Sequence, residues 1–227
     1  MGYDISRFDP KSHALARRRK LLESYAIDTV LDVGANIGQF AIQMRKDLGF
    51  SGKIISFEPL SSAFELLKLN AAGDPKWRVM HCALGDAESE SEINVAGNSY
   101  SSSFLDMLPF HIKSAPRSQY IGRETVEIKT LDSMMDDLCS MGANIYLKID
   151  TQGYESKVIN GAERSLAHIN TVQLEMSLIP LYQDASLFID MHKLLSQKGY
   201  TLVSIEPGFC DKNTGQLLQV DGIYHRF

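Results

Sequence analysis

Residues 29–40 read TVLDVGANIGQF. The first five residues show no alternation of polar and apolar positions, which is typical of a strand buried on both faces. A glycine-containing turn follows at 34–38, and residues 40–48 have a helical pattern. A strand, a glycine turn and a helix in this order indicate the first unit of a parallel sheet that binds a ligand at the carboxyl ends of its strands.

The rest of the chain repeats this alternation. Strands are predicted at 53–57, 77–83, 145–149, 171–175 and 200–205, and helices at 11–25, 60–71, 154–168 and 186–198. A last strand near 221–226 is predicted to pair antiparallel. We therefore expect an α/β fold: a doubly wound, mostly parallel sheet with helices on both faces and an antiparallel last strand.

Residues 85–130 interrupt the pattern with Glu/Ser-rich stretches and one alternating strand at 124–130, and we expect loops and a hairpin inserted there. Residues 1–27 are interpreted as an N-terminal helical extension, and 28–227 as a single domain.

The composition is that of a globular protein. Of 227 residues, 44 % are hydrophobic and 22 % are charged, and the net charge is −5. An acidic chain gains little from phosphate neutralisation, so nucleic acid is not an expected partner, and the basic run 17–20 is interpreted as a solvated helix face. Neither a signal peptide nor a membrane span is recognisable, and the three cysteines form no metal motif, so we expect a cytoplasmic protein.

The glycine spacing selects among nucleotide ligands. If Gly34 begins a dinucleotide fingerprint G-x-G-x-x-G, its other two glycines fall on Asn36 and Gln39, and a P-loop is also absent. What remains is a strand that contains Asp32, a Gly-x-x-x-Gly turn, and Glu58 at the end of the next strand. Because a carboxylate accepts hydrogen bonds from both hydroxyls of a ribose, this pattern favours a nucleoside without a pyrophosphate, of which S-adenosylmethionine is the common one.

The motifs of the chain as a whole resemble one family. VLDVGANIGQF at 30–40, ISFEP at 55–59, ALGD at 83–86, NSYSSSF at 98–104 and VEIKTLDSM at 126–134 appear in order. They are followed by YLKIDTQGYESKVINGA at 146–162, VQLEMSLIPLY at 172–182 and DGIYHR at 221–226. Together they resemble the FkbM-type methyltransferases, a branch of the class I, Rossmann-like S-adenosylmethionine enzymes.

The resemblance implies a set of cofactor-binding residues. The turn after the first strand would surround the methionine moiety and the near ribose. Glu58 would hold the ribose hydroxyls, with Pro59 shaping the turn beside it, and the third strand would end beside the adenine. The implied residues are Asp32, Gly34, Asn36, Gly38, Glu58, Pro59, Ala83 and Leu84. Asp86 is a candidate for the adenine amino group or for a turn.

Two carboxylates are the candidate catalytic residues. Asp150 follows an apolar strand, where it would accept the proton of an acceptor hydroxyl, although it would equally cap a helix or pair with Lys148 or Lys157. Glu175 would lie beside it on the neighbouring strand. Such a pair also suits Mg²⁺, but Asp221 is the sole candidate for a third ligand, so no metal site is expected. The alternative bases are His81, His111 and His225.

The acceptor is left open by the sequence. We expect Ser102, Ser103, Gln152 and Tyr182 to contact the substrate. The resemblance implies O-methylation of a small molecule or glycan, with sugar and polyketide hydroxyls as acceptors. A non-catalytic or nucleic-acid-directed S-adenosylmethionine-binding protein of the same fold is the alternative, and a homo-oligomer is compatible with the sequence.

Overall fold

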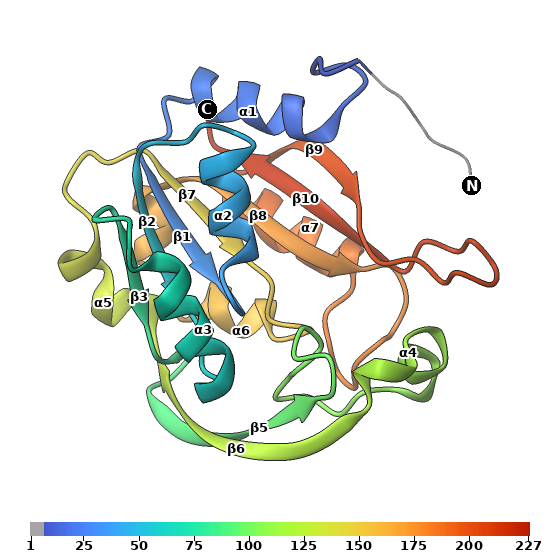
Figure 1. The fold of residues 1–227 in the computed structure, drawn as a ribbon. Coiled ribbons are helices and arrows are strands. Elements are labelled where there is room, and N and C mark those ends of the chain that lie inside the picture. The colour runs from blue at the N-terminus through green and yellow to red at the C-terminus, as the bar shows by residue number, and fades with distance from the viewer. Residues whose placement is uncertain (1–6) are drawn as a thin grey trace.

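A computed structural model describes residues 7–227, and its centre is a seven-stranded sheet (Figure 1). The strand order is β3-β2-β1-β7-β8-β10-β9. All neighbours are parallel except β10, which is antiparallel to both β8 and β9. The strands are β1 (Thr29–Val33), β2 (Lys53–Phe57), β3 (Trp77–Met80), β7 (Ile145–Ile149), β8 (Ile169–Ser177), β9 (Thr201–Pro207) and β10 (Gln219–His225).

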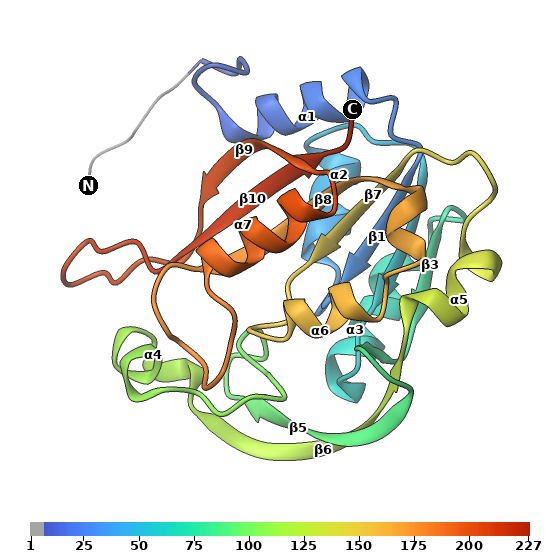
Figure 2. The ribbon, with the colours of Figure 1, turned by 180° about the vertical axis from the view of Figure 1, so that it is seen from behind.

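Helices cover both faces of this sheet, as the two opposite views show (Figures 1 and 2). One layer holds α1 (Ala14–Ser24), α2 (Gln39–Lys46) and α3 (Ser61–Ala71), and the other holds α5 (Leu131–Leu138), α6 (Glu155–Asn160) and α7 (Phe188–Gln197). Two apolar clusters, one on each face, fill the spaces between sheet and helices. Every residue of β1 and β7 is buried, which is why these strands are apolar without alternation. The predicted doubly wound fold is confirmed.

The predicted insertion forms a second, three-stranded sheet. Its order is β4-β6-β5, from β4 (Ala83–Leu84), β5 (Ser89–Ala96) and β6 (Tyr120–Lys129). The loop between β5 and β6 carries α4 (Pro109–Ser114) and a 3-10 turn (Pro116–Ser118). This long hairpin curves past the ends toward which β1 and β7 run (Figure 1). It therefore covers the edge of the sheet where ligands bind in this architecture.

Two predicted elements are divided in the structure. The expected strand at 77–83 divides, because Ala83 and Leu84 pair with β6 instead of continuing β3. The expected helix at 154–168 ends as α6 at Asn160, and a separate 3-10 turn spans Ser165–His168. At Gly161 a Cβ would lie 1.8 Å from the carbonyl oxygen of Gly85, so this break lets two backbones touch. In addition, α4 and α5 were not predicted.

The N-terminal helix is shorter than expected at both ends. Residues 11–25 were predicted as helix, whereas α1 begins at Ala14 and ends at Ser24. Ala16, Arg18 and Leu22 are buried against the rest of the chain. The first six residues of the proposed 1–27 extension lie outside the described residues.

Candidate functional site

A cavity of about 530 Å³ opens at the carboxyl ends of the parallel strands. Its volume is in the range of small-molecule and cofactor sites. One end is apolar, with Leu60, Ala83, Leu84, Ile93 and Phe104 in its wall. The other end is polar, and its wall contains Arg18, Lys148, Asp150, Gln152, Gln173, Glu175, Gln219 and Asp221. A ligand with an apolar ring system and a charged end matches this division.

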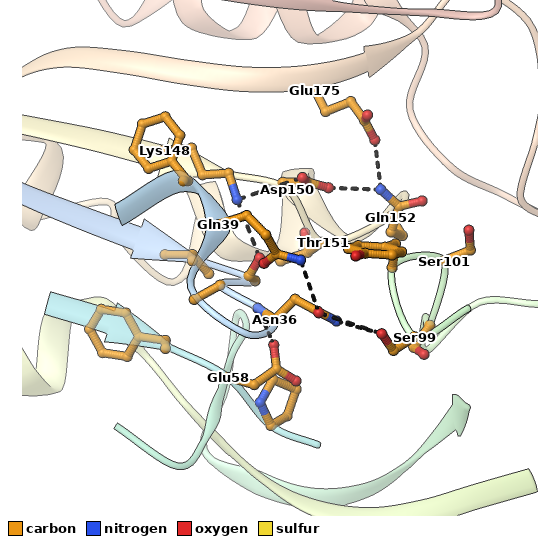
Figure 3. Close-up of a pocket in the computed structure, with 18 of the residues that line it drawn as sticks. Asn36, Gln39, Glu58, Ser99, Ser101, Lys148, Asp150, Thr151, Gln152 and Glu175 are labelled. Carbon is orange, nitrogen blue, oxygen red and sulfur yellow. Dashed lines mark hydrogen bonds and ion pairs between the residues drawn. The ribbon is translucent and has the colours of Figure 1, made fainter. Parts of the chain in front are cut away.

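The turn after β1 is shaped by a close contact with the loop after β7. Gly34 has φ +74°, and a Cβ on it would lie 1.9 Å from the carbonyl oxygen of Asp150. Asn36 also has a positive φ, of 50°, and its side-chain amide donates to the Ser99 hydroxyl at 3.1 Å (Figure 3). Gly38 does not line the cavity; it precedes α2 with φ +91° and packs against Trp77. The sequence therefore places glycine where two loops meet.

Glu58 follows β2 and lies at the wall of the cavity, next to Pro59. One carboxylate oxygen accepts from the backbone N–H of Asn36 at 2.7 Å, and the other from that of Leu60 at 2.8 Å. Burial raises the pKa of this carboxyl to about 7, and the two N–H donors oppose that rise only in part. Each oxygen keeps a lone pair for a ligand hydroxyl, so Glu58 fits a ribose diol.

The apolar end of the cavity fits an adenine ring. Ala83 and Leu84 are almost fully buried and belong to β4. Phe104, from the loop after β5, packs against Tyr154 with ring centroids 4.8 Å apart. Asp86 is absent from this wall, and its carboxylate instead pairs with Lys157 at 2.7 Å.

A buried ion pair lies under the glycine turn. The Lys148 ammonium is 3.2 Å from Asp32, 3.6 Å from Asp150 and 3.2 Å from the carbonyl oxygen of Gly34. Burial opposes the positive charge of Lys148, but the carboxylates of Asp32 and Asp150 outweigh it and raise the pKa of the ammonium. Lys148 is therefore a fixed cation. Asp32, predicted to contact the cofactor, is fully buried and does not line the cavity.

The two candidate catalytic carboxylates share one amide donor, as Figure 3 shows. The Gln152 amide nitrogen donates to Asp150 at 2.7 Å and to Glu175 at 2.7 Å. The structure thus brings these three predicted residues together in the cavity wall. Burial, followed by the charges of Asp150 and Asp221, raises the pKa of Glu175 well above its usual value. Asp150 is the more exposed of the pair, with its side chain 35 % accessible and beside a cation.

Two predicted substrate residues support Gln152 instead of lining the cavity. The Tyr182 hydroxyl donates to the side-chain oxygen of Gln152 at 2.7 Å, and the Ser103 hydroxyl donates to its backbone oxygen at 2.7 Å. Both side chains are buried outside the cavity wall. Gln152 has φ +55°, and these contacts hold it in that conformation. Ser102 does line the cavity, and its hydroxyl accepts from the backbone N–H of Ala96 at 3.0 Å.

Arg18 and Lys148 are among the residues of the site that the sequence analysis missed. Arg18 was interpreted as part of a solvated helix face, but it is 6 % exposed, ion-pairs with Glu206 and lines the cavity. Its spacing of four residues from Leu22 puts it on the buried side of α1, which was the available signal. Lys148 was considered only as a partner of Asp150, although a lysine inside an apolar strand indicates a buried carboxylate nearby.

Within the described part of the chain, no three His, Cys, Asp or Glu side chains are arranged to hold a metal ion. The helices of residues 7–227 are each too short or too polar to span a lipid bilayer.

Comparison with known families agrees with this geometry. The family model of the methyltransferase FkbM domain matches residues 32–202. The chain belongs to the FkbM methyltransferase family. This confirms the resemblance drawn from the motifs. No curated protein sequence is significantly similar to the chain.

Solved structures are similar to this chain at low sequence identity, and the first of them shows the same fold. The methyltransferase FkbM of Methylobacillus flagellatus is 13 % identical with a TM-score of 0.54, and the match covers 86 % of this chain but 43 % of that one. The rRNA methylase of Streptococcus thermophilus is 9 % identical, with a TM-score of 0.48 and coverage of 95 % and 97 %. The N-terminal domain of human METTL16, in complex with SAH, is 9 % identical, with a TM-score of 0.49 and coverage of 94 % and 70 %. This FkbM-family chain spans less than half of the length of the Methylobacillus flagellatus protein.

Proposed function

We propose that this FkbM-family chain is an S-adenosylmethionine-dependent O-methyltransferase whose acceptor is a hydroxyl of a small molecule or glycan. One observation carries the proposal: a single cavity joins the buried Glu58 carboxylate and an apolar slot to the carboxylates of Asp150 and Glu175. The Glu58 carboxylate and the apolar slot suit a nucleoside. The carboxylates of Asp150 and Glu175 suit a hydroxyl that must lose a proton.

The cofactor would lie along the glycine turn. Glu58 would accept from the ribose hydroxyls, and Ala83 and Leu84 would contact the adenine, while Gly34 and Asn36 would border the amino-acid portion. Bound S-adenosylmethionine supplies a methyl carbon already activated by a positively charged sulfur. The acidic residues of the cavity outnumber its cations, which favours a ligand with positive charge.

Asp150 is proposed as the general base. Asp150 would accept the proton of the acceptor hydroxyl as that oxygen takes the methyl group, with the electron pair of the broken carbon–sulfur bond left on the cofactor sulfur. The Lys148 ammonium lies 3.6 Å from the Asp150 carboxylate. Gln152 orients that carboxylate by donating to it at 2.7 Å. Lys148 itself is no base, because Asp32 and Asp150 hold it protonated.

Charge also favours a small hydroxyl acceptor over a nucleic acid. A phosphate entering the polar end would meet Asp150, Glu175 and Asp221. The two cations there, Lys148 and Arg18, already pair with carboxylates of the protein. Repulsion of this kind lowers affinity for a polyanion.

Calorimetric titration tests the cofactor. We expect S-adenosylmethionine and S-adenosylhomocysteine to bind at micromolar concentrations and NAD not to bind. Glu58→Ala should abolish this binding, whereas Glu65→Gln, at a mostly exposed ion-paired carboxylate on α3, should not change it. Transfer of labelled methyl groups to a panel of sugars, polyols and phenols, with product mass and linkage determined, then tests O-methylation. Binding of NAD alone, or methylation only at nitrogen, would contradict the proposal.

A further inference from the structure

Three carboxylates lie side by side across the last strands of the main sheet. Glu175 on β8 is the register partner of Asp221 on β10, and Asp221 is in turn the register partner of Glu206 on β9. Directly opposed residues of antiparallel strands have their Cβ atoms about 4.5–5.5 Å apart, and like charges in these positions are destabilising. We call these three residues the carboxylate row.

The protein compensates only one end of the carboxylate row. Arg18 from α1 pairs with Glu206. Among residues 7–227, no lysine, arginine or histidine forms an ion pair with Glu175 or Asp221. Neutral amides serve them instead: Gln152 and Gln219 donate to Glu175 at 2.7 and 2.8 Å, and Gln173 donates to Asp221 at 3.0 Å.

This arrangement raises the pKa of both carboxyl groups. Burial raises the pKa of Asp221, and the Gln173 hydrogen bond reverses that rise only in part. Burial and the neighbouring carboxylates also raise the pKa of Glu175. Glu175 and Asp221 thus face each other without a cation in direct contact, while the more distant charges of Arg18 and Lys148 lower the pKa of Asp221 only in part. A positively charged ligand between the two carboxylates would relieve both the repulsion and the loss of hydration.

The uncompensated part of the row faces the cavity. Glu175, Asp221, Gln173 and Gln219 all line its polar end. Two further side chains of this wall have polar atoms without a partner: the Nε of Arg18, which is 6 % exposed, and the Nδ1 of His111, which is 3 % exposed. Both atoms are themselves almost inaccessible to solvent, so they are unsatisfied polar groups at this end of the cavity and not contacts for a ligand.

We propose that Glu175 and Asp221 bind an ammonium group of the acceptor, so that the methylated molecule is an aminated polyol such as an amino sugar. This inference rests on the proposed function and narrows its substrate class. The ammonium sits between the two carboxylates, and a hydroxyl of the same molecule reaches Asp150. Anionic acceptors are excluded by the same charges.

A series of sugars that differ in charge tests this inference. Glucosamine, glucose and glucuronate are titrated into the full-length protein saturated with S-adenosylhomocysteine, and dissociation constants are measured by ligand-observed NMR. We expect glucosamine to bind about tenfold more tightly than glucose, which corresponds to ~1.4 kcal/mol. Glucuronate should bind more weakly than glucose.

Two variants test whether the preference for glucosamine over glucose depends on Asp221. Asp221→Asn keeps the oxygen that accepts from Gln173, so it removes charge with little change of shape. It should reduce glucosamine binding to the level of glucose and leave glucose within about twofold, because a neutral ligand gains no charge-assisted bond. Glu65→Gln removes a mostly exposed carboxylate on α3 and should change nothing.

The outcomes separate this inference from the proposed function. If S-adenosylhomocysteine fails to bind the wild-type protein, the proposed function fails. If it binds but glucosamine shows no advantage over glucose, only the ammonium site is overturned. If Asp221→Asn weakens S-adenosylhomocysteine as strongly as glucosamine, the carboxylates serve the amino-acid end of the cofactor, and the inference is also wrong.

Discussion

The Lys148 ammonium lies 3.2 Å from the Asp32 carboxylate, and both side chains are buried under the glycine turn. Side chains from three neighbouring strands meet at this pair. Lys148 belongs to β7 and Asp32 to β1, and the Ser56 hydroxyl on β2 donates to Asp32 at 3.2 Å. The pair thus ties together the centre of the sheet at the point where the cavity begins.

Removing the cation should destabilise the protein strongly. In Lys148→Met, Asp32 becomes an unpaired buried charge, and we expect a loss of about 3–5 kcal/mol in the free energy of unfolding. Urea denaturation measures it. Lys157→Met, which breaks the exposed pair with Asp86, should change the free energy of unfolding much less. Equal losses in the two variants would contradict a structural role for the Lys148–Asp32 pair.

The glycine turn should tolerate no side chain. Gly34→Ala adds a Cβ that would lie 1.9 Å from the Asp150 carbonyl oxygen, whereas Gly49, with a similar φ of +68°, has no atom within 4 Å of such a carbon. Gly49→Ala therefore measures only the cost of placing an alanine at a positive φ, a loss of about 1–2 kcal/mol in the free energy of unfolding. We expect Gly34→Ala to cost clearly more in urea denaturation and to weaken S-adenosylhomocysteine binding. Similar costs at the two sites would show that the loop after β7 moves aside.

Cofactor affinity should fall as the pH falls through 7. Burial raises the pKa of Glu58 to about 7, so below that pH most molecules of the free protein carry a protonated carboxyl with fewer acceptor sites. If the ionised form binds, the affinity for S-adenosylhomocysteine drops up to about tenfold per pH unit below 7 and is constant above it. Calorimetry from pH 5.5 to 8.5 measures the profile. Glu58→Gln should bind weakly and without this dependence; a flat wild-type profile would refute the assignment.

Loss of the Asp150 carboxylate should reduce turnover far more than it reduces affinity for S-adenosylhomocysteine. In Asp150→Asn we expect turnover of the acceptor identified by the methyl-transfer panel to fall about 10²–10⁴-fold, the usual contribution of a general base. Affinity for S-adenosylhomocysteine should stay within about twofold. Asp86→Asn, at a carboxylate outside the cavity wall, serves as the matched control and should turn over normally. Normal turnover by Asp150→Asn would remove the assignment of this base.

The fold was largely predictable because its central strands are buried on both faces. Continuous apolar runs such as Thr29–Val33 and Ile145–Ile149 mark such strands directly. The break after Asn160 was missed, although Gly161 at the end of α6 is a local stop signal; only its contact with the Gly85 backbone, 76 residues earlier in the chain, has no local pattern. Contacts between distant segments leave no local pattern in a single sequence.

The candidate site was predictable for residues that the sequence places at or near strand ends, and not for residues such as Arg18 and Gln173. Glu58 and Asp150 come directly after β2 and β7, and the architecture brings such positions to one edge. Arg18 and Gln173 reach the same cavity from within α1 and β8. Their participation depends on packing, which composition and spacing do not specify. The interpretation of Arg18 as solvated was accordingly wrong.

The position of β10 between β8 and β9 has a consequence for the order of assembly. On the ribosome β9 emerges first, yet its only hydrogen-bonded neighbour in the sheet is β10, which is synthesised later. Until Gln219–His225 has emerged, β8 remains an unpaired edge and β9 has no place in the sheet. Asp221 joins Glu175 only at that moment. The part of the sheet formed by β1, β2, β3 and β7 is therefore synthesised before the part that needs β10.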